Sequence, residues 1–217
     1  MKKALSHTAI VMTLVYILAQ FLPVLIIVLA PQSYQTEALI YGNLFSFTAG
    51  AFVMLLLNRK SNIRNSITLS PSAPRSTVIL WGILGIFMAL AAQYAATLIE
   101  IFLLGLPMGS ENTQQILLSI DKYPLYLIIV SIMAPIMEEF VFRKVIFGFF
   151  YDITGGVGAA VISSLLFAFM HFDSHILLYS TIGFVFSYLY VKTKNIATPI
   201  IAHVLMNTVV VLLNLFL

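Results

Sequence analysis

Two adjacent carboxylates, Glu138 and Glu139, lie inside the apolar stretch SIMAPIMEEFVFRKVIFGFF, residues 131–150. Arg143 follows Glu139 by four residues, with the acid first, a spacing that favours an ion pair on a helix. Glu138 then projects about 100° away around the same helix. A carboxylate at the centre of a membrane costs about 2.5–3.5 kcal/mol on insertion scales. Two such groups indicate a function, in which arginine holds one acid while the other faces a different neighbour.

Three further polar side chains fall in later apolar segments. His171 ends FAFMH, and His203 and Asn207 bracket HVLMN, where their spacing of four places them on one helix face. Counted at about 1.5 Å per residue from the cytoplasmic edge, Glu138 and His171 lie ~21 Å deep and His203 ~14 Å deep. These depths permit one shared site.

The elements that must position these side chains are membrane-spanning helices. The chain is 61% hydrophobic and 9% charged, with a mean hydropathy of +1.04, whereas a globular domain is about 25% charged. Its apolar runs can cross ~30 Å of hydrocarbon as helices, and they lack the short alternation of a β-barrel. We predict an all-α, polytopic transmembrane bundle with about seven spans. Their expected ranges are 8–30, 37–57, 77–104, 123–151, 157–171, 175–191 and 196–217.

The distribution of basic residues predicts a cytoplasmic N-terminus. The first apolar segment is too long for a signal peptide, and Pro31 follows its only small-residue site, so we expect an uncleaved first span. Lys122 alone falls on a segment placed outside. The basic residues placed inside are Lys2, Lys3, Arg59, Lys60, Arg64, Arg75, Arg143, Lys144, Lys192 and Lys194. Topology accounts for this charge, so we expect no nucleic-acid partner. The absence of cysteine excludes a thiol nucleophile, disulfides and thiolate metal ligands.

Most of the other acidic residues are assigned to the outer surface. Glu100 is expected to reach the outer headgroups, and His175 is expected in an interfacial loop. On this placement Glu138 and Glu139 are the only acids within a span.

Prolines and small residues predict local features of the helices. Pro135 and Pro199 precede the acidic pair and His203, and each is expected to remove a helical hydrogen bond and favour a kink. The stretch GILGIFMALAAQYAA, residues 82–96, has small residues at helical spacing and predicts a packing seam.

Taken together, three motifs resemble those of a known family. EEFVFR matches EExxxR, FAFMH matches FxxxH and HVLMN matches HxxxN, in this order on successive late helices. The chain therefore resembles the CPBP, or Abi, family of CAAX-processing endoproteases and bacteriocin-processing proteins. The resemblance covers roughly residues 120–217. Within a single transmembrane domain of residues 1–217, it implies a catalytic core over 121–217, with the first three spans, in 1–120, outside the motifs.

The resemblance implies an intramembrane endopeptidase. By analogy, Glu138, with Glu139 close by, acts as general base on a water positioned with His171. His203 and Asn207 stabilise the oxyanion. Peptide hydrolysis does require a base, an oriented water and donors aimed at the developing charge.

The resemblance gives Arg143 and Phe167 supporting roles and leaves a metal open. His171, His203 and Glu138 form a plausible zinc set with an open fourth position. Family members are often labelled metalloproteases, yet the same residues can work without a metal, and the sequence has no HExxH helix. Zinc and a metal-free site both stay open.

Alternatives to the enzyme come from other classes. A proton-coupled carrier would use Glu138, Glu139 and His171 as a titrating relay, although the chain shows no paired inverted repeats. A non-catalytic immunity or interaction protein would keep the scaffold. Taken alone, the Glu139–Arg143 pair and the two histidines also suit structural ion pairing and interhelical hydrogen bonding.

The expected substrate is a peptide or small protein at the cytoplasmic leaflet, with a lipid-anchored or amphipathic end. Membrane lipid is the other expected partner. We expect the plasma membrane of a bacterium, which favours a leader or signalling peptide over a prenylated protein.

Overall fold

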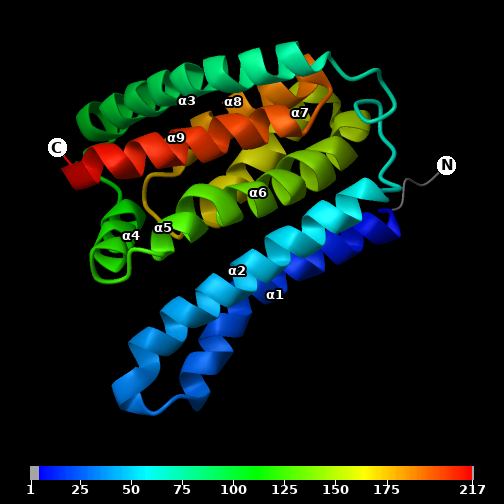
Figure 1. Ribbon diagram of the computed structural model, residues 1–217. Coiled ribbons are helices and arrows are strands. Elements are labelled where there is room, and N and C mark those ends of the chain that lie inside the picture. Colours follow the sequence, from blue (N-terminus) through cyan, green and yellow to red (C-terminus); the bar gives the residue numbers. More distant parts are fainter. Residues whose placement is uncertain (1–4, 217) are drawn as a thin grey trace.

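The computed structural model describes residues 5–216, and these fold into helices with no strand among them (Figure 1). Six helical stretches are long and apolar enough to cross a membrane. The all-helical, polytopic architecture predicted from composition is therefore confirmed.

The first two spans form a hairpin. Helix α1, His7–Leu29, is followed by the short η1, Gln32–Tyr34, and by α2, Gln35–Arg59. Pro23 lies inside α1 and has no N–H to donate to the carbonyl of Ala19. The hydroxyl of Ser46 on α2 donates to that carbonyl instead, at 3.0 Å, and so ties the two spans together.

A second group consists of α3, Arg75–Leu104, α8, Ile176–Thr193, and α9, Ala197–Phe216. Gly82, Gly85 and Ala89 of α3 are buried where α3 packs on α8 and α9. A Cβ on Gly85 would lie 2.7 Å from the Cβ of Ala202. The predicted packing seam is therefore confirmed, because its small residues allow the helices to approach closely.

The helix that carries the acidic pair runs from Tyr126 without a break through four consecutive segments. These are α5, Tyr126–Ile128, the π-helical η2, Ile129–Met133, α6, Ala134–Glu138, and the π-helical η3, Glu139–Phe147. We call them together the acidic helix. Stretches of π-helix inside α-helices are frequent at functional sites.

The boundary between the expected fourth and fifth spans is a single residue. Helix α7, Gly148–Phe169, includes Gly155 with φ 76° and ψ 175°, outside the helical region. Positive φ suits glycine, and the chain reverses there, so that the rest of α7 packs back against η3 and beside α8. The expected loop at 152–156 is thus nearly absent. Residues 126–169 therefore form two helical segments that meet at Gly155 with almost no loop between them.

One helix was not expected. Helix α4, Glu111–Lys122, lies between α3 and α5 and is too short to cross the membrane. Ser110 caps it by accepting from the backbone N–H of Thr113 at 3.1 Å. In Figure 1 it lies across the end of the bundle where α3 and α9 terminate.

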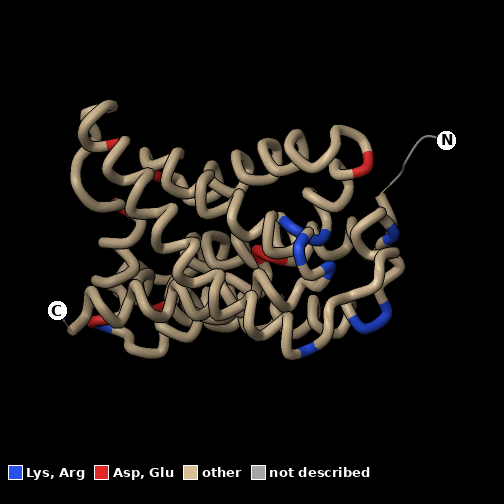
Figure 2. The backbone as a smooth tube through the Cα atoms, turned by 90° about the horizontal axis from the view of Figure 1, so that it is seen from above, with Lys and Arg blue, Asp and Glu red and all other residues tan. Residues whose placement is uncertain are grey.

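Charges are distributed unevenly between the two ends of the bundle (Figure 2). Arg59, Arg75 and Lys194 lie at the end of α2, the start of α3 and the end of α8, which meet at one end. Helix α4 lies at the opposite end, where the acidic residues Glu111 and Asp121 are. Lys2 and Lys3, which support the predicted orientation, lie outside the described residues.

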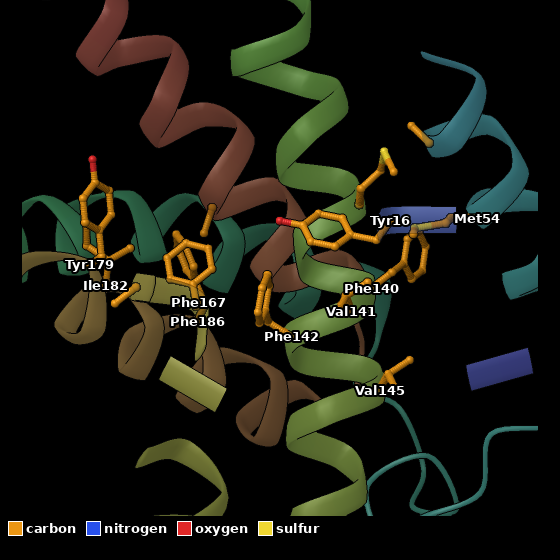
Figure 3. Close-up of a cluster of buried hydrophobic side chains, with 14 of the residues drawn as sticks. Tyr16, Met54, Phe140, Val141, Phe142, Val145, Phe167, Tyr179, Ile182 and Phe186 are labelled. Atoms are coloured by element: carbon orange, nitrogen blue, oxygen red, sulfur yellow. The ribbon is translucent and has the colours of Figure 1, made fainter. Parts of the chain in front are cut away.

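The core cluster in Figure 3 joins the hairpin to the rest of the bundle. The ring of Phe142 on the acidic helix contacts Tyr16 of α1 edge-on, with ring centroids 5.8 Å apart. On its other side Phe142 contacts Phe167 of α7 at 5.4 Å. This apolar layer therefore links α1, the acidic helix and α7.

Candidate active site

Glu139 is fully buried and fixed by two partners. Its Oε2 lies 3.3 Å from Nε of Arg143, and its Oε1 lies 2.8 Å from Nδ1 of His203 on α9. Arg143 also donates to the carbonyl of Gly183 on α8 at 3.3 Å. Its guanidinium lies 4.5 Å from the centre of the Phe167 ring. The ion pair expected from the spacing of four is present, and it connects three helices.

Glu138 faces a different environment. Its side chain keeps 13% of its surface exposed, and its Oε2 lies 3.7 Å from Nε2 of His203. It lines a cavity of about 210 Å³, and His171 and Asn207 line the same cavity. The structure therefore brings Glu138, His171 and Asn207 together around one cavity. His203 lies beside it.

His171 is held by contacts on both sides of its ring. Its Nδ1 lies 2.8 Å from the carbonyl oxygen of Phe167, one turn earlier on α7. Its ring stacks on Tyr179 of α8, with centroids 3.9 Å apart and planes at 24°. With Nδ1–H donating to the carbonyl, Nε2 is the nitrogen that can accept a hydrogen bond in the cavity.

Asn207 is held by a backbone carbonyl that Pro135 leaves without a helical donor. In η2 the N–H of Ala134 bonds to the carbonyl of Ile129, five residues earlier. Pro135 has no N–H for the next such bond, which leaves the carbonyl of Val130 without a helical donor. Nδ2 of Asn207 donates to that carbonyl at 3.0 Å. The second Nδ2 hydrogen is left for another acceptor.

Comparison with known proteins gives the family. A family model described as "Type II CAAX prenyl endopeptidase Rce1-like" matches residues 121–209. MroQ of Staphylococcus aureus (strain USA300), named as a membrane-embedded CAAX protease, is 36% identical over 93% of this chain and 87% of its own length. The chain belongs to the Rce1-like CAAX protease family.

A second relative supports this assignment. YdiL of Bacillus subtilis (strain 168), named as a proposed membrane peptidase, is 45% identical over 80% of this chain and 71% of its own length. No solved structure matches the chain. As a member of this family, the protein is a membrane peptidase.

In this CAAX-family protein the cavity also takes residues from outside the motifs. Gln20 of α1, Phe47 of α2, and Asn112 and Thr113 of α4 all line it. The side chain of Tyr16 lies beside Gln20. No sequence motif indicated these residues, although the spacing of four between Tyr16 and Gln20 places both on one face of α1.

Phe167 packs against both imidazoles of the site and against Arg143. Its ring lies 4.6 Å from that of His171 and 5.7 Å from that of His203. It is buried, with 1% of its surface exposed. This side chain therefore separates the two imidazoles and covers the guanidinium of Arg143.

The geometry does not fit the zinc set that the resemblance left open. Among residues 5–216, no three His, Asp or Glu side chains are grouped as metal ligands would be. Nδ1 of His171 and Nδ1 of His203 each already have an oxygen partner, and Nε2 of His203 lies 3.7 Å from Glu138. We therefore derive no catalytic step through a metal.

The expectation for Glu100 is wrong, whereas His175 lies at the start of α8, as its N-cap, within the expected loop. Both side chains are buried, and Nδ1 of His175 lies 2.7 Å from Oε2 of Glu100. Oε1 of Glu100 accepts from the backbone N–H of Leu178 at 3.0 Å, in the first turn of α8. Glu100 thus satisfies a free N–H at a helix N-terminus and does not reach the headgroups, so the acidic pair is not the only buried acid.

The kink expected at Pro199 is also absent. Helix α9 begins at Ala197, so Pro199 lies in its first turn. Backbone N–H groups in a first turn have no intrahelical partner, and proline is tolerated there.

Proposed function

We propose that this protein is an intramembrane endopeptidase that hydrolyses a peptide bond with a water activated by Glu138. The observation that supports this best is the common cavity of Glu138, His171 and Asn207, with His203 at its edge. Proton transfer by a positioned side chain contributes about 10²–10⁴-fold to a rate, and a carboxylate beside a bound water can provide it.

Glu138 is the better candidate for the base. It faces the cavity, whereas both oxygens of Glu139 lie beside buried partners. Nε2 of His171 accepts one hydrogen of the water and so orients it. Glu138 takes the other proton as the water oxygen attacks the scissile carbonyl, and it later passes this proton to the leaving amine.

His203 and Asn207 are the candidates for oxyanion stabilisation. Nδ1–H of His203 donates to Glu139, which directs Nε2 toward the Glu138 side of the cavity. Nε2, when it carries a proton, and the second Nδ2 hydrogen of Asn207 are then available to the developing negative charge. In this mechanism Glu139, Arg143 and Phe167 are positioning residues.

The test compares Glu138→Gln with Glu139→Gln in purified, detergent-solubilised protein. Glu138→Gln is expected to lower the rate of peptide cleavage at least 10²-fold with little change in thermal stability, because its contact with Nε2 of His203 is long, at 3.7 Å, and its side chain stays partly exposed. Wild-type cleavage by Glu138→Gln at normal membrane levels would contradict the mechanism and favour a non-catalytic interaction protein. Proton flux in proteoliposomes that depends on Glu138 would favour the carrier.

The substrate and location belong to the same proposal. A membrane-associated or lipid-anchored peptide suits a site bounded by spanning helices. The two relatives come from bacteria, which supports the plasma membrane of a bacterium and a leader or signalling peptide as substrate.

A further inference from the structure

The cavity extends from Glu138 in one direction only. On the acidic helix its lining residues are spaced by four or nearly so and run from Glu138 through Ala134 and Val130 to Tyr126. This face covers ~18 Å at 1.5 Å per residue. On α9 the lining runs from Asn207 toward Val211, which leads to the same end of the bundle.

In the opposite direction the cavity is closed. No residue after Glu138 on the acidic helix and none before Asn207 on α9 lines it. Glu139, Arg143 and His203 fill that space with buried contacts. The rings of Phe142 and Phe167 lie against them.

The open direction leads to the end of the bundle that carries few basic residues. The cavity reaches Asn112, Thr113 and Ile116 of α4. That end lies opposite the one that carries Arg59 and Arg75 (Figures 1 and 2). Lys and Arg mark the cytoplasmic side of membrane proteins, so α4 lies on the extracytoplasmic side.

Resting on the proposed peptidase function, we propose that substrate reaches Glu138 from the extracytoplasmic half of the membrane, between α4 and the first two turns of the acidic helix. The occupant is an extended peptide segment that has already crossed the membrane or is anchored in its outer leaflet. This differs from the cytoplasmic access expected from the sequence.

The lining of this route suits an extended peptide backbone. Polar groups line it from Asn112, Thr113 and the hydroxyl of Tyr179 at the mouth to Asn207 farther in. Apolar side chains such as Ile116 and Val210 line it as well. An extended peptide presents both backbone amides and side chains, and its amides need partners once they leave water.

The chain contains no cysteine, so single cysteines can report which side of the membrane reaches the cavity. Thr113→Cys lies at the mouth and Ala134→Cys lies one turn from Glu138. Asn62→Cys is the control, because Asn62 lines a separate cavity of about 160 Å³ at the basic end. Each variant is expressed in bacterial cells and treated with a membrane-impermeant sulfonated methanethiosulfonate reagent, before and after the membrane is opened.

The expected result is labelling of Thr113→Cys and Ala134→Cys in intact cells, with Asn62→Cys labelled only after opening. Labelling of Ala134→Cys only after opening would overturn the proposal. Labelling of Asn62→Cys in intact cells would overturn it too, because the orientation would then be reversed. If Ala134→Cys fails to accumulate, Met170→Cys takes its place, because Met170 lines the same cavity next to His171.

Labelling requires no catalysis, so this test separates the two proposals. Labelling of Ala134→Cys in intact cells would support the access route even if Glu138→Gln cleaved peptide at the wild-type rate. That cleavage would contradict only the proposed catalytic mechanism. In the solubilised Thr113→Cys variant, the same reagent is expected to lower cleavage at least tenfold by blocking the mouth. The cysteine-free wild type is expected to show no change.

Discussion

Glu138 and Glu139 are neighbours in the sequence, yet each has a different set of partners. Both oxygens of Glu139 lie within 3.3 Å of a basic group, whereas the nearest basic atom to Glu138 is 3.7 Å away. The step of about 100° per residue on a helix is enough to cause this, because it directs one side chain to Arg143 and the other to the cavity.

Glu139→Gln is expected to cost stability as well as activity. Removing one partner of a buried ion pair leaves the other charge uncompensated and typically costs about 3–5 kcal/mol. Thermal unfolding in detergent should therefore show a clearly lower midpoint for Glu139→Gln than for Glu138→Gln. Equal midpoints for the two variants would contradict the assignment of Glu139 as the structural member.

Arg143→Lys is expected to weaken the ion pair with Glu139 although the positive charge is kept. Lysine has no planar group to donate to both Glu139 and the carbonyl of Gly183 while lying over the ring of Phe167. We expect a lower unfolding midpoint and a cleavage rate reduced at least tenfold. Retained stability and activity in Arg143→Lys would mean that a point charge suffices.

The roles of these residues were only partly predictable. The i, i+4 spacing predicted the Glu139–Arg143 pair because helical geometry alone determines it. It could not reveal that Glu139 also bonds to His203, since this depends on how α9 packs against the acidic helix. Glu100 was misplaced for a similar reason, because its partner on α8 is 75 residues away in the sequence.

At the scale of elements, the seam of α3 determines how close three helices approach. A Cβ added at Gly85 would lie 2.5 Å from Cδ1 of Leu189 and 2.7 Å from Cβ of Ala202. The Cβ of Ala202 cannot rotate away. Gly85→Ala should therefore destabilise the protein by about 1–3 kcal/mol, the usual cost of overpacking a core.

Gly156→Ala is the matched control for Gly85→Ala. A Cβ there would meet only the ring of Tyr151, at 3.3 Å. Unfolding midpoints measured by circular dichroism should fall for Gly85→Ala and change little for Gly156→Ala. A similar fall for both would indicate that helical glycines matter here for reasons other than packing.

Asp173 fastens α4 to the loop between α7 and α8. Partial burial raises the pKa of its carboxyl, but donation from the N–H of Asn112, the N–H of His175 and the hydroxyl of Ser110 lowers it below its ordinary value of 3.8. A lowered pKa means that this stabilisation is complete above the ordinary value. It is lost as the pH falls through the lowered pKa.

Asp173→Asn tests this pH dependence. The variant should unfold at a lower temperature than wild type at pH 6, and the difference should shrink as the pH falls below about 3.8. Thermal unfolding in detergent at both pH values measures it. A difference that stays constant over this range would mean that the charge of Asp173 contributes nothing.

Helix α4 shows what element prediction from sequence missed. A search for spans long enough to cross ~30 Å passes over a helix of twelve residues. Its cap at Ser110 is a local signal that could have found it. The reversal at Gly155 was harder to place, because one glycine with positive φ replaces a loop.

At the scale of the whole molecule, the first two spans are part of the site although no motif lies in them. Gln20 and Phe47 line the cavity from the hairpin of α1 and α2. The hairpin contacts the acidic helix through its core layer. The cavity is therefore lined both by residues of the expected catalytic core, 121–217, and by residues of the spans that precede it.

Gln20→Leu is expected to raise KM several-fold with a smaller change in kcat. Gln20 lines the cavity and holds none of the proposed catalytic groups, so its loss removes binding that substrate and transition state share. Gln115→Leu on the exposed face of α4 is the matched control. Steady-state cleavage of one peptide by both variants measures the difference, and an unchanged KM in Gln20→Leu would argue against contact with substrate.

The hydrogen bond between Asn207 and the carbonyl of Val130 limits how the site could be built into another protein. The acceptor exists because a proline five residues further along the acidic helix cannot donate to it, and the amide that occupies it belongs to another helix 77 residues away. In a chimera that has Asn207 but another residue at position 135, the backbone N–H of that residue would donate to the carbonyl of Val130. The side-chain amide of Asn207 would then lose its acceptor. Engineering this site into a new scaffold would require proline and asparagine to be transferred as a pair.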